Sequence, residues 1–371
     1  MLLLNRYLAK EIGGVLIVAA PAICLLVALL QGMRLAPVVA GADIAGLEAA
    51  RLIGLLLVPL VSAVLPAAAV ISLLVAFGRL AGDGELVALR ASGVGSGGLA
   101  VAPVVVCAAV ALTSGAVSIF GEPGAYTAMH RRLGELLSRA AMSRVRPGVI
   151  CEPTEAITVW SQARRGNRLN GVFIEDRHSD PPVQLFAAAA SFGPLAERPA
   201  VRLVLEDGEL QARAPDGTLT RATFSRLETV VELEGASRSL ASLVPRHLGR
   251  SPWQLIDDAR SDAPGARTAA LVLHRRLSVA PGTVGLCILT LLLVLWRPVT
   301  GRPLAIVLGA LLVLGYHILV RTGEAASEAG LVSPAAGGWL ASGACWLAVG
   351  SRVIISRVRR GPRDRYACDT P

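Results

Sequence analysis

Six long apolar stretches dominate the sequence, and each approaches the length that a helix needs to cross a lipid bilayer. A bilayer core of about 30 Å requires about 18 to 20 consecutive apolar residues in a helix that rises about 1.5 Å per residue. The stretches cover residues 12–30, 52–77, 99–121, 277–296, 303–320 and 331–351. This pattern predicts an α-helical membrane protein with six transmembrane helices, three on each side of a long polar segment.

The first stretch must be distinguished from a signal peptide. Its apolar part is longer than the ~7–15 residues of a signal-peptide core, and no clear cleavage triplet follows it. The stretch also begins directly after Lys10 and Glu11. We therefore expect a retained helix.

The polar segment between the third and fourth stretches has a different pattern. From residue 144 to about residue 243, short apolar runs alternate with clusters of turn-forming residues. The runs are 156–160, 171–174, 183–186, 201–205, 219–224 and 229–233, and the turn clusters are 165–167, 179–182, 206–208 and 215–217. Short strands at this spacing predict an all-β, jelly-roll-like domain. An amphipathic helix over 126–144 and a shorter one over 252–259 are expected to connect it to the spans.

The distribution of basic residues predicts the orientation of these parts. We divide the chain into 1–121 with three spans and a short cytoplasmic helix near 79–94, 122–270 with the β domain, 271–356 with three spans, and a basic tail over 357–371. If the amino terminus is cytoplasmic, the short outer flanks of the spans carry only Arg34, Arg51 and Arg321, whereas basic residues crowd the inner flanks. Cytoplasmic flanks of membrane proteins carry such an excess. We expect both termini inside and the β domain outside.

Composition supports a membrane protein and excludes several other classes. Hydrophobic residues make up 53% of the 371 residues and charged residues only 17%, against about 25% charged in soluble domains. The net charge of +9 does not indicate nucleic-acid binding, because the arginines form no single stripe and no aromatic residues are interleaved with them. The six cysteines lack metal-ligand spacing, and we expect neither a metal site nor a catalytic residue.

The sequence also lacks the motifs of an energy-converting enzyme. Lys10 is the only lysine, and it does not lie in a phosphate-binding GxxxxGK[ST] loop, so ATP and Mg²⁺ are expected on a separate partner chain. Ser96, within the run GVGSGG, is interpreted as a turn residue rather than a nucleophile. No acidic residue lies inside the six stretches to bind a coupling ion, and His317 is more typical of packing than of a proton relay.

Several motifs together resemble one family of permeases. They are the segment 77–94 (FGRLAGDGELVALRASGV), the start 6–11, Leu65 with Pro66, and the segment 330–334 with Trp339. With the order of three spans, β domain and three spans, they resemble the LptF/LptG (YjgP/YjgQ) permease family over nearly the whole chain. Segments 171–176 and 273–276 favour the LptF branch.

The resemblance implies a function and a set of partners. Members of the family form the membrane part of the ABC transporter that extracts lipopolysaccharide from the bacterial inner membrane. It implies a second LptF/LptG-type permease, a cytoplasmic LptB-like ATPase dimer, and LptC-like and LptA-like periplasmic proteins that receive lipopolysaccharide from the jelly roll. This chain itself would hold no cofactor.

The resemblance also points to site residues. It implies that Glu85 pairs with a basic residue in a groove of the ATPase, on a short helix whose remaining candidate coupling residues are Arg79, Leu86, Leu89 and Arg90. Because Leu86 and Leu89 are three residues apart, this helix is expected to bury the face that carries them. The alternative is that Glu85 is a solvated helix charge. Arg34, Arg51 and Arg321 are candidate phosphate contacts, although arginines at span ends also commonly extend to the interface without a ligand.

Two other functions remain open from the sequence. One is a membrane-anchored scaffold that binds a partner through its β domain. The other is a secondary exporter, which would need a coupling-ion site that the sequence does not reveal.

Overall fold

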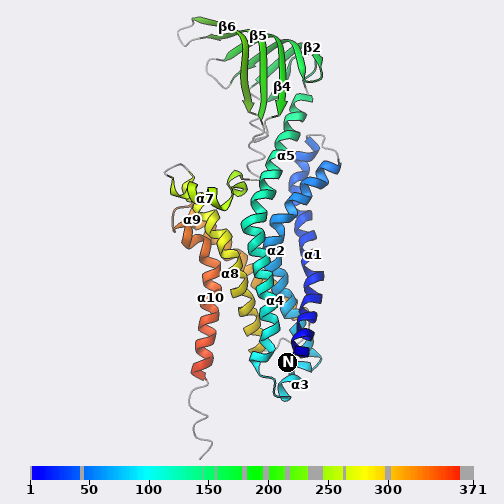
Figure 1. Cartoon of the computed structure of the whole chain (residues 1–371), viewed down its shortest axis with the longest axis vertical. Helices are drawn as coiled ribbons and strands as arrows, with labels where there is room; N and C mark the ends of the chain where they lie inside the picture. Colours follow the sequence, from blue (N-terminus) through cyan, green and yellow to red (C-terminus); the bar gives the residue numbers. More distant parts are fainter. Residues whose placement is uncertain are drawn as a thin grey trace, which may run out of the picture. The chain divides into compact units, whose positions relative to one another are not determined.

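The computed structural model describes residues 2–41, 46–143, 145–154, 157–177, 182–194, 200–213, 218–232, 245–261, 265–296 and 302–359 (Figure 1). The chain divides into two units. The helical unit comprises Met1–Leu29, Leu57–Gly124 and His247–Pro371, and the sheet unit comprises Leu30–Leu56 and Ala125–Arg246.

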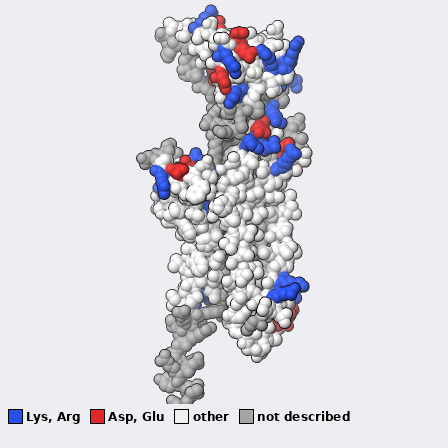
Figure 2. Space-filling view, in the orientation of Figure 1, with Lys and Arg blue, Asp and Glu red and all other residues white. Residues whose placement is uncertain are grey.

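Long helices confirm the predicted class of membrane protein. The helices are α1 (Leu2–Gly41), α2 (Gly46–Gly82), α3 (Glu85–Ala91), α4 (Ser96–Ala116), α5 (Glu122–Ser143), α7 (Pro252–Arg260), α8 (Ala266–Trp296), α9 (Arg302–Glu328) and α10 (Pro334–Arg359), with a π-helical turn η1 (Val117–Gly121) and a 3₁₀ turn η2 (Arg246–Gly249). Six segments among the described residues are long and apolar enough to cross a membrane. On the face drawn in Figure 2, uncharged surface covers the middle of the helices and charged side chains gather elsewhere.

The helix that contains the third apolar stretch continues well past residue 121, where that stretch ends. Helix α4 passes through η1 directly into α5, so that one helical segment runs from Ser96 to Ser143. Pro123 has no amide hydrogen to donate to the carbonyl four residues before it, and the π-helical turn lies at that place. The predicted helix over 126–144 is confirmed as far as Ser143, and it continues the helix of the third span without a break.

Helix α2 occupies the centre of the helical unit, whereas α1 and α9 lie at its surface. In the most apolar stretch of each, 72% of α2 is buried, compared with 6% of α1 and 11% of α9. Leu73, Leu74 and Phe77 of α2 pack in a core with Leu99 of α4 and Leu291 of α8. Helices α1 and α9 consequently present apolar faces that nothing in this chain covers among the described residues.

Small residues allow the helices of the unit to approach closely. A Cβ built on Gly115 of α4 would lie 2.8 Å from the Cβ of Ala280 of α8. Ser342 of α10 donates a hydrogen bond to the Ser278 carbonyl of α8 at 2.9 Å, and Trp346 donates one to the Pro281 carbonyl at 3.0 Å. Such contacts are typical of helices that pack within a membrane.

The sheet unit confirms the predicted inserted β domain. Its strands are β1 (Cys151–Thr154), β2 (Ile157–Arg165), β3 (Arg168–Asp176), β4 (Val183–Pro194), β5 (Ala200–Arg213) and β6 (Leu219–Glu232). They form one antiparallel sheet in the order β1-β2-β3-β4-β5-β6, in which each described strand pairs with its sequence neighbours. Strand β1 was not predicted, and the run 219–224 and the described part of the run 229–233 both lie in the single strand β6.

Of the four predicted turns, one is confirmed and one is wrong. The turn at 165–167 is confirmed, with Gly166 in the left-handed region at φ 59°. The cluster 206–208 was wrongly predicted as a turn, because it lies inside β5. Clusters 179–182 and 215–217 fall almost wholly outside the described residues.

A transverse crease explains why a turn signal lies within a strand. One residue of each described strand from β2 to β6 has no backbone partner on the neighbouring strands, and these residues form a row across the sheet. The residue pairs on both sides of this row keep the same register. The row consists of Gln162, Gly171, Ala188, Asp207 and Ser225. Gly171 and Asp207 adopt left-handed conformations, with φ of 58° and 50°. In β4 the buried residues are at odd positions before the row (Leu185 and Ala187) and at an even position after it (Ala190). Because of this change, the buried side chains on both sides of the row belong to one core.

Candidate functional site

The short helix α3 packs tightly at one end of the helical unit. Gly84 adopts φ 74° between α2 and α3, a conformation that glycine adopts without steric cost. Leu86 is buried in the core and Leu89 packs against it, whereas Val87 on the same helix is exposed. As the leucine spacing predicted, α3 buries one face and leaves another open.

Glu85 lies in a small polar cluster that joins three helices. The Tyr7 hydroxyl of α1 donates to Glu85 Oε2 at 2.7 Å, and Arg79 Nη2 of α2 donates to the Tyr7 oxygen at 3.0 Å. Arg79 Nε also lies 2.8 Å from Glu11 Oε1. The structure thus brings Arg79 and Glu85 together through Tyr7, a residue that sequence reasoning did not select.

Arg90 connects α3 to a fourth helix. Its Nη2 atom donates to the carbonyl oxygen of Leu295, near the carboxyl end of α8, at 2.5 Å. A cation is favourable at this position because the last carbonyl groups of a helix carry partial negative charge. Helix α3 is therefore bonded to α2, through Tyr7, and to α8.

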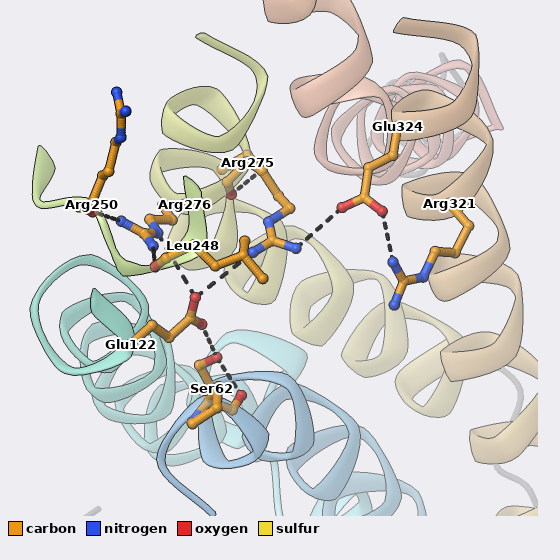
Figure 3. Close-up of polar contacts among 10 residues, drawn as sticks. Ser62, Glu122, Leu248, Arg250, Arg275, Arg276, Arg321 and Glu324 are labelled. Atoms are coloured by element: carbon orange, nitrogen blue, oxygen red, sulfur yellow. Dashed lines mark hydrogen bonds and ion pairs between the residues drawn. The ribbon is translucent and has the colours of Figure 1, made fainter. Parts of the chain in front are cut away.

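A second polar cluster, which the sequence did not predict, lies farther along the same helices (Figure 3). At its centre is Glu122, the first residue of α5, with only 5% of its surface exposed. Ser62 Oγ of α2 hydrogen-bonds to Glu122 Oε1 and lies 2.9 Å from the Pro59 carbonyl oxygen. Because a serine hydroxyl has one proton, it can donate to only one of these acceptors at a time.

Two consecutive arginines of α8 complete this second cluster, which we call the outer cluster because the sequence predicts that this end of the helices faces outward. Arg276, 1% exposed, donates to the carbonyls of Arg250, at 2.8 Å, and Leu248, at 2.5 Å, and its Nε lies 3.8 Å from Glu122 Oε2. Arg275 Nη2 is also 3.8 Å from Glu122 Oε2. Its Nη1 lies 3.3 Å from Glu324 of α9.

The buried charges in this cluster depend on one another. Removing one partner of a buried ion pair costs about 3–5 kcal/mol, because the other charge is left uncompensated. Glu122 Oε2 accepts no hydrogen bond from the described residues. It interacts instead with the charges of Arg275 and Arg276, each of which has a nitrogen 3.8 Å away. Burial of His247 on η2, assisted by the charge of Arg275, lowers its pKa below the usual value.

The predicted phosphate contacts differ in their surroundings. The Arg34 side chain lies outside the described residues. Arg51 is exposed and pairs with Glu48 at 2.5 Å in the sheet unit. Arg321 of the helical unit is exposed and pairs at 2.9 Å with Glu324, which connects it to Arg275 (Figure 3).

The two remaining residues that the sequence singled out, Ser96 and His317, lie in ordinary positions of their helices. Ser96 begins α4, and His317 Nδ1 lies 3.0 Å from the Val313 carbonyl of its own helix. Among the described residues, no group of three or more His, Cys, Asp or Glu side chains is arranged to hold a metal ion. The one available signal for the outer cluster was charge at the edges of apolar stretches, namely Glu122 after the third and the Arg275–Arg276 pair before the fourth.

Among the described residues, the six long apolar helices, with a six-stranded sheet inserted between the third and the fourth of them, define a multi-pass membrane protein with an inserted β domain. The chain belongs to the LptF/LptG family: the family described as lipopolysaccharide export system permease LptF/LptG matches residues 6–355. An uncharacterized protein of Rickettsia prowazekii (strain Madrid E) is 27% identical over 229 residues, which are 61% of this chain. The matched region spans 63% of that relative, slightly less than two thirds of its length.

Proposed function

We propose that this chain is a permease subunit of an ABC transporter that extracts lipopolysaccharide from the bacterial inner membrane, with ATP hydrolysed by a separate LptB-like dimer. The observation that carries the proposal is the attachment of α3. This short helix is bonded to α8 directly and to α2 through Tyr7 of α1, yet it leaves Val87 exposed and Glu85 partly accessible. A helix held in this way can transmit a push from a cytoplasmic partner to two membrane spans.

The apolar faces of α1 and α9 support a second membrane subunit. Exposed side chains such as Ile17 and Leu25 on α1, and Leu311 and Leu314 on α9, need either lipid or a partner helix. A second LptF/LptG-type permease opposite these faces would enclose a cavity for acyl chains. The phosphate groups of the lipid would then meet Arg34, Arg51 or Arg321 at the outer ends of the spans.

The sheet unit supports transfer of the lipid to periplasmic proteins. Strands β1 and β6 are the edges of the described sheet, and such edges readily add a strand from a partner. An open groove of about 830 Å³, lined in part by Trp160, Phe173 and Phe186, crosses the sheet beside the crease. We infer that LptC-like and LptA-like proteins continue the sheet, with both termini of the chain cytoplasmic and the sheet in the periplasm.

The test is a charge reversal on α3. Glu85→Lys should leave membrane insertion intact but greatly reduce co-purification of the ATPase and, with it, lipopolysaccharide release in proteoliposomes. If the contact is partly desolvated, the loss corresponds to about 2–5 kcal/mol of docking energy. Asp83→Lys, the same charge change two residues away at an exposed position, is the matched control and should retain most of the ATPase.

The same experiment distinguishes the proposed permease from the alternative function, a membrane-anchored scaffold. A membrane-anchored scaffold would bring down periplasmic partners without an ATPase, and Glu85→Lys would change nothing. Wild-type levels of ATPase and transport in Glu85→Lys would contradict the proposed coupling contact.

A further inference from the structure

The two polar clusters of the helical unit are bonded to the same two helices. At the α3 end, Arg79 of α2 joins α3 through Tyr7, and the Leu295 carbonyl of α8 accepts a hydrogen bond from Arg90. At the other end, Ser62 of α2 and Arg276 of α8 both engage Glu122. At about 1.5 Å per residue, Ser62 and Arg79 are roughly 25 Å apart along α2, and Arg276 and Leu295 roughly 28 Å along α8. Helices α2 and α8 are thus fastened to each other at both ends.

The contacts of Glu122 suggest which partner moves. Arg276 is anchored independently, because two of its nitrogens donate to the carbonyls of Leu248 and Arg250. Ser62 has an alternative acceptor in the Pro59 carbonyl. Glu122 itself follows the π-helical turn η1, a helix irregularity that is frequent at functional sites. Both neighbours therefore keep a hydrogen-bond partner if the carboxylate leaves, although the charges of Arg275 and Arg276 lose a counter-ion. The carboxylate is thus the group whose position can change, at an electrostatic cost.

A tight helix contact lies below the carboxylate on the same interface. On the continuous helix α4–α5, Gly115 is seven residues, or about two turns, before Glu122. On α8, Ala280 is four residues, or about one turn, after Arg276. Gly115 and Ala280 are in direct contact. This contact forms a fixed point, about which a change at Glu122 separates or joins the outer ends of the helices.

We propose that Glu122 is a latch, a positioning residue that holds the outer ends of α2 and α8 together and is released when α3 is displaced. This role rests on the proposed transport function. The charges that face Glu122 are Arg275 and Arg276 of α8, with Glu324 and Arg321 of α9 connected through Arg275. In the structure, the latch joins α2 to α8 at one end, and the contacts of α3 join the same two helices at the other end.

The first test uses the purified full-length chain without partners. Spin labels on cysteines at Leu57 of α2 and Leu277 of α8, both exposed and near the latch, report the separation of the two helices after the native cysteines are replaced. Glu122→Gln keeps the size of the side chain and removes its charge, and it should shift the distance distribution to longer values. Glu122→Asp should give an intermediate distribution, and Glu135→Gln, on α5 away from the cluster, should match the wild type.

The second test uses the assembled, reconstituted complex. Glu122→Gln should lower lipopolysaccharide released per ATP hydrolysed at least about fivefold, the smallest change expected for a coupling contact, while ATPase co-purification stays normal. A distance distribution and a transport ratio equal to those of wild type and Glu135→Gln would overturn the latch. If Glu122→Gln does not fold, the Glu122→Asp distribution decides: a wild-type distribution overturns the latch and a longer one supports it. Failure of the wild-type chain to bind an ATPase would overturn the proposed function, and the distance measurement would still decide the latch.

Discussion

Gly115 of α4 and Ala280 of α8 lie so close that a Cβ on Gly115 would stand 2.8 Å from the Cβ of Ala280. Real Cβ atoms do not approach to that distance, so any larger residue at 115 must push the two helices apart. The contact depends on the missing side chain of glycine, as is usual where membrane helices pack closely.

Gly115→Val is therefore expected to destabilise the protein by about 1–3 kcal/mol, the range for overpacking a close contact. Thermal unfolding in mild detergent measures the change. Gly97→Ala on the same helix has open space around its new Cβ and serves as the control. Equal melting temperatures for Gly115→Val and wild type would mean that the helices do not meet at this point.

The crease in the sheet leads to a second prediction. A Cβ on Gly208 would lie 2.3 Å from the Phe186 carbonyl oxygen and 2.5 Å from Cζ of Phe224. Gly208→Ala should therefore open the sheet at the crease and make it sensitive to limited proteolysis, at a cost of about 1–3 kcal/mol. Gly193→Ala on β4, where nothing lies within 4 Å of the new Cβ, should leave the protease pattern unchanged.

A third prediction concerns pH. Burial and the charges of Arg275, Arg250 and Arg276 lower the pKa of His247, and Glu328 opposes this shift. Because its pKa is lower in the folded chain than the usual ~6.5, the unfolded chain binds the proton more readily, so stability is complete above about pH 7 and decreases as pH falls through 6.5. The maximum slope for one proton is about 1.4 kcal/mol per pH unit.

Thermal unfolding between pH 8 and pH 5 tests this sign. His247→Gln should flatten the loss of stability below pH 7, whereas His317→Gln, on the exposed surface of α9, should retain the wild-type curve. A stability that rises on acidification in a His247-dependent way would contradict the prediction.

A fourth prediction tests the orientation. Single cysteines at Asn167, in the turn between β2 and β3, and at Ser92, just after α3, are both exposed. After replacement of the six native cysteines, a membrane-impermeant maleimide applied from the periplasmic side should label Asn167→Cys and not Ser92→Cys. Labelling of Ser92→Cys alone would place the sheet unit in the cytoplasm.

Much of the architecture was predictable because it depends on local patterns. The length of an apolar run is a property of consecutive residues, and it correctly predicted six spans. The succession of short apolar runs and turn clusters predicted the inserted β domain in the same way. The spacing of Leu86 and Leu89 predicted that one face of α3 is buried. In contrast, Asp207 and Gly208 carry the composition of a turn, but their strand neighbours place Asp207 in the crease and Gly208 beside it, within a continuous sheet.

The sequence by itself therefore determined the number of spans, the place and class of the inserted domain, and the resemblance that directed attention to Glu85. Only the tertiary structure decided the outer cluster, because its members are far apart in the chain: Ser62 and Glu122 are 60 residues apart, and Arg276 comes from beyond the sheet unit. Hydrophobic length reveals that a helix crosses the membrane, but not which of its faces meets another helix. A glutamate at the end of an apolar run is an ordinary interfacial charge until packing surrounds it with Ser62, Arg275 and Arg276.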